Sequence, residues 1–320
     1  MRGDAFADPA GKGPEPVPSR ILYPDGVPEL PEVETIARGL DQRVAGDTVE
    51  SVWIGSRKQP LKSPASLIAS VLEGKRIVRV HRAGKHIVFD LEEQSRAARA
   101  PTKRAQRTAR GKRPQAVSLK TAQWIVHLGM TGRMMVSEPR AEIAKHTHLI
   151  ATLGSGRELR FIDPRMFGKL SVHLQPGGFD PGGVEPLEVS EEGFVTLFRG
   201  RKTAMKSALL NQKLLRGVGN IYADESLFRA GIRPRRRAGS LTREQLGKLH
   251  RVVREVLSEA ITLGGSSISD YVDADGEEGF FQLQHRVYGR EGEPCLVCGT
   301  PIRRIVLTGR SSHYCSKCQK

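Results

Sequence analysis

Pro28-Glu-Leu-Pro-Glu-Val-Glu-Thr35 is the stretch of this chain that decides most about its fold. Apolar residues recur at helical spacing from within this stretch, at Val33, Ile36, Leu40 and Val44, and Gly46 closes the run. The pattern predicts an amphipathic helix with a proline in its first turn.

The same stretch places Glu29 directly after Pro28, which matters if the chain in the cell begins at that proline. A free α-amino group has a pKa of about 7.7 to 8.0, so part of it is neutral and nucleophilic at neutral pH. Such a secondary amine can attack a sugar carbon and form an iminium. Glu29 can supply or remove the proton that this chemistry needs.

Pro28 is preceded by 27 residues, and an amine inside a peptide bond has no basicity. A GTG codon gives valine within a message and methionine at a bacterial start, so Val27 fits a start site assigned too far upstream. We therefore expect residues 1–27 to be a disordered upstream extension, because they are rich in Pro and Gly and show no periodicity. A genuine disordered tail is the alternative.

The length of 320 residues allows two domains, and the net charge of +16 favours a polyanionic partner, most often nucleic acid. The alternative is that the charge serves solubility alone. No stretch is apolar and long enough to cross a bilayer, and residues 1–26 lack the apolar centre of a signal peptide.

All four cysteines lie near the C-terminus, as two Cys-x-x-Cys pairs with 16 residues between them: Cys295, Cys298, Cys315 and Cys318. This spacing predicts one structural zinc ion held by four thiolates. Two disulfides would suit a secreted chain, which the missing signal peptide argues against.

Short apolar or alternating runs predict a strand-rich first domain, arranged as a β-sandwich. The runs cover residues 49–54, 76–80, 86–91, 123–128, 148–153 and 169–174. Between them, residues 96–113 carry eight Lys or Arg and no acid, which predicts a disordered basic insertion over 93–116. It either adds non-specific DNA affinity or is a tolerated loop.

From Val189 to about Ser267 the apolar period changes to that of a helix. Thr242 and Gln245 form a capping box before a long amphipathic run, and Gly264-Gly265 ends that run. The cysteine module contributes two further strands, at 302–307 and around His313-Tyr314, joined near Gly309-Arg310.

Several motifs occur in an order that resembles the bacterial formamidopyrimidine-DNA glycosylases. They are the stretch at 28, His-Leu-Gly-Met-Thr-Gly at 127, Asp-Pro-Arg-Met-Phe-Gly at 163, Gly-Val-Gly-Asn-Ile-Tyr-Ala at 217, Val-Tyr-Gly-Arg at 287 and the cysteine module. The resemblance implies an α+β chain of two domains. The N-terminal β-sandwich with flanking helices would span 28–180, the helix-two-turn-helix domain 185–275 and the zinc-binding β-hairpin 285–320.

The resemblance also implies the activity and its catalytic residues. A bifunctional DNA glycosylase and abasic-site lyase would remove oxidised purines such as 8-oxoguanine and formamidopyrimidines in base excision repair. Pro28 would form the Schiff base, Glu29 would protonate the opening sugar, and Lys85 would assist β-elimination and hold a phosphate. Arg310 would grip the phosphate for the second, δ-elimination.

The remaining residues carried over by the resemblance contact DNA. Met130, Arg165 and Phe167 correspond to a wedge that fills the stack when a base is extruded. The phosphate and flanking contacts would come from His146, Arg165, Arg201, Lys206 and Asn220. His148 reads better as a histidine packed in the interior.

Two rival functions stay open at this point. One is an endonuclease VIII-like glycosylase for oxidised pyrimidines, which Leu30-Pro31 and the segments at 280–281 and 287–290 disfavour. The other is a DNA-binding protein without catalysis, if residues 1–27 remain attached. The expected partner is damaged double-stranded DNA, with no membrane, no nucleotide cofactor, a monomeric state and a cytoplasmic, nucleoid-associated location.

Overall fold

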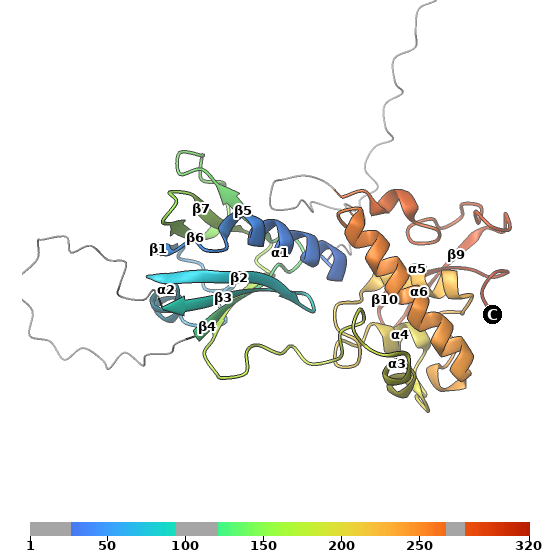
Figure 1. Ribbon diagram of the computed structural model, residues 1–320. Helices are drawn as coiled ribbons and strands as arrows, with labels where there is room; N and C mark the ends of the chain where they lie inside the picture. The colour runs from blue at the N-terminus through green and yellow to red at the C-terminus, as the bar shows by residue number, and fades with distance from the viewer. Residues whose placement is uncertain (1–26, 94–120, 267–278) are drawn as a thin grey trace, which may run out of the picture.

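The computed structural model describes residues 27–93, 121–266 and 279–320 (Figure 1). The expected extension up to residue 26 and the expected basic insertion from residue 94 onward lie outside the described residues. The described chain has two halves, a β-sandwich followed by a helical half that ends in a two-stranded hairpin. No helix within the described ranges has the length and apolar character needed to cross a membrane.

Two antiparallel four-stranded sheets form the sandwich. In the first sheet the strand order is β1 (Val49–Ile54), β6 (Thr147–Leu153), β7 (Glu158–Ile162), β5 (Arg133–Ser137). In the second it is β2 (Lys75–Ala83), β3 (His86–Glu93), β4 (Thr121–His127), β8 (Lys169–His173). Two helices, α1 (Leu30–Val44) and α2 (Ala65–Leu72), pack against the strands.

All six strands that the sequence predicts are present, and the structure adds β5, β7 and α2. Strand β7 escapes sequence analysis because Arg160 interrupts its apolar pattern although the side chain is only 3% exposed. Its guanidinium pairs with Glu158 and donates to the carbonyls of Ala141 and Glu142. A buried cation can occupy the interior only because these partners replace its hydration.

The helical half comprises α3 (Glu191–Phe198), α4 (Met205–Leu209), α5 (Asn220–Ala230) and α6 (Arg243–Thr262). Two short 3-10 turns, Ala238–Ser240 and Phe281–Gln284, complete it. The capping box is confirmed: Gln245 N–H donates to Thr242 Oγ1 at 3.2 Å, and Thr242 N–H donates to Gln245 Oε1 at 3.1 Å. The chain leaves α6 through Gly264 and Gly265, both with positive φ, as the sequence predicts.

Helix α1 connects the two halves, and Figure 1 shows its N-terminal end directed at the helical half. Leu30, its first residue, is fully buried in the core of the helical half. Val33 and Ile36, one turn later, are buried in the sandwich core. The apolar face of α1 therefore packs into both cores, and the N-terminal end of the helix lies where the two cores meet.

The C-terminal hairpin consists of β9 (Ile302–Leu307) and β10 (Arg310–Cys315), paired antiparallel. The four cysteine Sγ atoms lie within 4.8 Å of one another, with 3.9 Å between Cys295 and Cys318 and 3.5 Å between Cys298 and Cys315. Thiolates on a tetrahedral zinc ion, at about 2.3 Å from the metal, lie about 3.8 Å apart. The four side chains thus fit one zinc ion, and the closed ligand set makes the site structural.

Loss of the zinc ion should unfold this hairpin, because only a small apolar cluster accompanies the cysteines, including Phe228, Val287 and Ile302. Structural zinc contributes about 10–16 kcal/mol in zinc-finger peptides, far more than such a cluster can. In Cys298→Ser we expect less bound zinc and rapid proteolysis within 292–320, with the strand signal of the sandwich unchanged. Ser316→Ala, which lies between Cys315 and Cys318 and removes no zinc ligand, is the matched control. A zinc-free chain with a protease-resistant hairpin would contradict the prediction.

Candidate active site

A cavity of about 660 Å³ lies at the junction of the two halves. Its lining comes from four separate segments: the start of the described chain, the β2–β3 turn, the α4–α5 region and the tip of the C-terminal hairpin. Among the lining residues are Glu29, Lys85, Asn220 and Arg310. Pro28 is half-buried between Val27 and Glu29, both of which line the cavity.

Glu29 is 4% exposed at the N-cap of α1 and also reaches the N-terminus of α5. Its Oε1 accepts the N–H of Ile221 at 3.1 Å, and its Oε2 has no hydrogen-bond partner among the described residues. Burial raises the pKa of Glu29 to about 7, against the charge of Lys85, while Glu32 raises it further. A carboxyl group with that pKa can carry a proton at neutral pH, as a general acid must.

Lys85 occupies the two-residue turn between β2 and β3. Gly84, the first turn residue, has φ +59°, while Lys85 is not among the positive-φ residues. This is the pattern of a type II′ turn, which matches the twist of the two strands. Burial lowers the pKa of Lys85, and Glu29 and Glu32 oppose this shift.

Arg310 is the first residue of β10 and is exposed. The hairpin turn consists of Thr308 and Gly309, with φ +50° and +75°, which is the type I′ pattern. The sequence placed this turn one residue later. A β-branched residue rarely adopts φ > 0, and the Thr308 hydroxyl is hydrogen-bonded to Ser207 Oγ at 2.9 Å.

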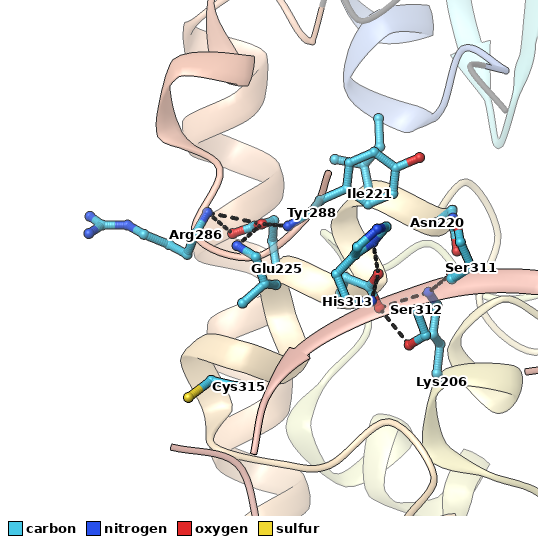
Figure 2. A network of polar contacts seen from close by, with 12 residues as sticks. Lys206, Asn220, Ile221, Glu225, Arg286, Tyr288, Ser311, Ser312, His313 and Cys315 are labelled. Atoms are coloured by element: carbon cyan, nitrogen blue, oxygen red, sulfur yellow. Dashed lines mark hydrogen bonds and ion pairs between the residues drawn. The ribbon is translucent and has the colours of Figure 1, made fainter. Parts of the chain in front are cut away.

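Helix α5 anchors the C-terminal hairpin through two adjacent acidic residues (Figure 2). The buried Asp224 carboxylate accepts Ser312 Oγ at 3.0 Å and His313 N–H at 2.8 Å. The next residue, Glu225, accepts the backbone N–H groups of Arg286, Val287 and Tyr288 at 2.9 to 3.0 Å. Two adjacent carboxylates thereby fix the position of β10 and of residues 286–288, which precede the zinc module.

Lys206 differs from the expectation that it contacts DNA. Its side chain is fully buried; Nζ lies 2.7 Å from Asp224 Oδ1 and donates to the Ser311 carbonyl at 2.5 Å (Figure 2). Burial lowers the pKa of Lys206 and Asp224 opposes this shift. The ammonium therefore neutralises the carboxylate that holds β10 instead of facing the cavity.

Asn220 begins α5, is 5% exposed and donates from Nδ2 to Ser311 Oγ at 3.1 Å. Its Oδ1 is buried without a hydrogen-bond partner among the described residues. The glycines before it allow close approaches: a Cβ on Gly219 would lie 2.2 Å from Glu29 Cδ, and Gly217 has φ +88° beside Leu30. Only glycine fits these positions, which explains the Gly-Val-Gly that precedes Asn220.

The expected wedge residues lie on two adjoining turns of the sandwich. Arg165 and Phe167 are exposed, Met130 is half-buried, and the Arg165 guanidinium lies 5.0 Å from the centroid of the Phe167 ring. The buried Asp163 carboxylate joins the turns by accepting Thr131 Oγ1 at 2.6 Å and Gly168 N–H at 2.7 Å. The structure therefore places the two motifs side by side, and the sequence analysis assigned no role to Asp163, although it begins the second motif.

Three further residues were singled out from the sequence. His146 is exposed with φ +70°, and its carbonyl accepts Asp163 N–H at 3.0 Å. His148 is 4% exposed and its Nε2 lies 2.9 Å from the Asp163 carbonyl oxygen, which agrees with an interior histidine. Arg201 is exposed on the surface of the helical half, and its Nε donates to the Leu197 carbonyl.

Two residues near the cavity were missed by sequence analysis. His127 precedes the Met130 turn, and burial, helped by His86 and Lys85, lowers its pKa to about 4. Gly129 N–H donates to its Nδ1 at 3.1 Å, which leaves the hydrogen of the neutral ring on Nε2. Glu32 is buried and accepts hydrogen bonds from Tyr222 Oη and from Ser266 N–H, the latter at 2.8 Å. His127 and Glu32 both lie within the motifs at 127 and 28, and this is the feature of the sequence that could have identified them.

Three family models match the chain in succession. The N-terminal domain of formamidopyrimidine-DNA glycosylase matches residues 27–170, and the H2TH domain of the same enzymes matches 183–272. The zinc finger found in these glycosylases and in isoleucyl-tRNA synthetases matches 292–320. Together they include every segment that lines the cavity.

Individual relatives and solved structures support the same family. Formamidopyrimidine-DNA glycosylase of Solibacter usitatus is 42% identical over 295 residues, covering 92% of this chain and 100% of the relative. The crystal structure of MutM (Fpg) from Thermus thermophilus has a TM-score of 0.74 at 38% identity, covering 91% of this chain and 98% of that one. Lactococcus lactis Fpg, crystallised with DNA containing an oxidised pyrimidine, has a TM-score of 0.76 at 30% identity, with 92% and 100% covered. The chain belongs to the formamidopyrimidine-DNA glycosylase family.

Proposed function

We propose that this chain removes oxidised purines from double-stranded DNA in base excision repair and then cuts the strand at the abasic site. The observation that carries the proposal is the cavity between the halves, which gathers Glu29, Lys85, Asn220 and Arg310 beside Pro28. Acid, amine and cationic groups meet there from segments far apart in the sequence. A flipped nucleotide needs such a pocket, because its reactive atoms are inaccessible inside the duplex.

In the proposed first step, the free amine of Pro28 attacks C1′ of the damaged nucleotide. The bond between C1′ and the base breaks, and the departing base anion takes up the proton that the Pro28 amine loses. Glu29 then protonates the sugar ring oxygen, and the opened sugar remains bound to Pro28 as an iminium. The raised pKa of Glu29 supports this role, because with a pKa of about 7 a substantial share of the Glu29 carboxyls carries a proton near neutral pH.

The following steps use the same covalent intermediate. The iminium acidifies the hydrogens on C2′, and removal of one expels the 3′ phosphate by β-elimination. A second elimination releases the 5′ phosphate and leaves a gap. Lys85 is proposed to assist the first elimination and to hold a phosphate, and Arg310 to grip the phosphate that leaves in the second.

The other residues are proposed to bind the duplex. Met130, Arg165 and Phe167 would fill the space left by the flipped base, and Phe167, at 51% exposure, is available for stacking. His146, Arg165, Arg201 and Asn220 would contact the backbone. Lys206 is assigned instead to the support of β10.

The proposed domains are 28–180, 185–275 and 285–320, and one chain would act on one damaged site. We further propose that the chain works in the cytoplasm on nucleoid DNA.

The damaged base tests the substrate class directly. We expect faster single-turnover removal of 8-oxoguanine opposite cytosine than of thymine glycol from duplexes of equal sequence. A member of the same family has been crystallised with an oxidised pyrimidine in its DNA, so the pyrimidine is the informative competitor. Faster release of thymine glycol would favour the second candidate, a glycosylase for oxidised pyrimidines.

The state of the Pro28 nitrogen tests the mechanism. A chain that begins at Pro28 should form a covalent adduct with 8-oxoguanine DNA under borohydride, because reduction traps the iminium. A chain that retains residues 1–27 should bind the same DNA without an adduct, because an amide nitrogen cannot attack C1′. Equal adduct yields from both chains, confirmed by intact mass, would overturn the role of Pro28.

Replacement of the proposed acid tests Glu29. In Glu29→Gln we expect single-turnover base removal to fall by about 10²–10⁴-fold, the usual contribution of a general acid. The amide can still accept the Ile221 N–H, so folding and DNA binding should persist. Glu50→Gln, an exposed acid on β1, is the control and should behave as wild type.

The same variant reports the pKa of Glu29 through stability. The folded pKa of about 7 lies above the ordinary 4.5, so protonated Glu29 stabilises the free protein fully below about pH 4.5. This contribution is lost as the pH rises through 7, and glutamine does not titrate. The unfolding free energy of wild type minus that of Glu29→Gln should therefore fall between pH 5 and 8. A constant difference would show that the pKa is not raised.

A further inference from the structure

Strand β2 carries an arginine at every third position, and each pairs with a carboxylate. Arg76 and Arg79 pair with Glu92 and Asp90 across the β2–β3 hairpin, with side chains 43% and 61% exposed. Arg82 is different, because its side chain is only 6% exposed and its two carboxylate partners lie outside the hairpin. Arg82 therefore links the β2–β3 hairpin to other parts of the chain, whereas the ion pairs of Arg76 and Arg79 stabilise only the hairpin itself.

The guanidinium of Arg82 joins three segments of the chain. Nη1 and Nη2 donate to the two carboxylate oxygens of Glu185 at 3.0 and 2.9 Å. Nε donates to Glu34 of α1 at 2.8 Å, and Nη1 also donates to the Gly84 carbonyl at 3.3 Å. Glu185 lies in the connector between the halves, and Gly84 immediately precedes Lys85.

Glu185 extends this network to the loop before α5. Its Oε2 accepts Nε of Arg216 at 3.2 Å, and the neighbouring Gly217 carbonyl accepts Leu30 N–H at 3.0 Å. The Gly84 turn packs on Arg216, since a Cβ built on Gly84 would lie 3.4 Å from Arg216 Cβ. The three segments that carry Glu29, Lys85 and Asn220 are thus linked through one buried pair.

Stability alone is a weak reason for such a pair. Burial of an arginine and a carboxylate costs solvation that their attraction only partly repays, whereas the fork geometry fixes their relative orientation. Among the described residues Lys85 makes no hydrogen bond or ion pair of its own that would fix its position. Glu29 is held separately, through the Ile221 N–H and the cap of α1. The Arg82 network therefore bears most directly on Lys85.

We propose that Arg82 and Glu185 are positioning residues that set the Lys85 turn against the rest of the cavity, and so govern strand cleavage more than base removal. The proposal rests on the proposed function, in which Lys85 assists β-elimination. Neither residue touches the substrate; both act through the Gly84-Lys85 turn and the connector.

The test separates the two chemical steps in a single turnover on 8-oxoguanine duplex. Base release, borohydride-trapped intermediate and cleaved strand are each measured over time for Arg82→Met and Glu185→Gln. Misplacing a reacting group by about 1 Å can cost about 10²-fold, so we expect elimination to slow by about 10- to 100-fold. Base release should change less than about threefold, so the trapped intermediate accumulates.

Two further variants distinguish geometry from charge and from general damage. Arg79→Met, on the same strand, should retain the wild-type ratio of intermediate to product. Arg82→Lys keeps the charge but lacks the fork that spans Glu185 and Glu34, so it should resemble Arg82→Met. A wild-type ratio in Arg82→Lys would assign the effect to charge and overturn the positioning role.

The remaining outcomes are also decisive. Equal losses in base release and elimination, or no change in either, would overturn the proposal while wild-type activity leaves the proposed function intact. Absence of base release from the wild-type chain beginning at Pro28 would instead refute the proposed function. If Arg82→Met does not fold, Glu185→Gln carries the test, because it preserves volume and one acceptor oxygen.

Discussion

The burial of two carboxylates at the start of α1 is the constraint on which the rest of the molecule depends. Leu30 enters the helical core while Val33 enters the sandwich core, so the intervening turn must cross the junction of the halves. Glu29 and Glu32 lie in that turn and are buried with their oxygens directed at groups of the helical half. A buried carboxylate is tolerated only when its hydrogen-bond partners are fixed. If the two halves packed in another register, the carboxylates of Glu29 and Glu32 would be buried without these partners, which is unfavourable.

The same constraint tunes the chemistry. Burial raises the pKa of both Glu29 and Glu32, and each ionised carboxylate would disfavour ionisation of the other. Lys85 opposes the shift at Glu29 from across the cavity, and the balance places that pKa near 7. The proposed acid thus owes its proton to the closure of the two halves. An isolated sandwich would expose Glu29 to water and remove the main cause of the shift.

The sequence predicted features whose cause is local, and it failed where the cause is a distant partner. The period of α6, the Thr242 capping box and the cysteine spacing each depend on neighbours in the chain. Lys206 resembles a surface lysine in a basic stretch, and only the fold brings Asp224 beneath it. Arg160 and Arg82 are similar, because their carboxylate or carbonyl partners make burial possible and cannot be identified from spacing. Buried ion pairs are therefore the part of this structure that the sequence alone does not predict.

The three groups proposed to handle phosphate come from short, sterically defined turns. Lys85 lies in a two-residue II′ turn, Arg310 follows a two-residue I′ turn, and Asn220 follows Gly-Val-Gly. A short turn has few conformations to lose, so the backbone that carries each group is ordered before the substrate binds. Each turn is also anchored at its base. The Arg82 network holds the Lys85 turn, the Asp224 carboxylate holds the strand that begins at Arg310, and Glu29 contacts the start of α5 beside Asn220. Lys85 and Arg310 repel each other electrostatically. The carboxylates behind the two turns hold the turns in place, so the cavity does not depend on bound DNA to keep these cations close together.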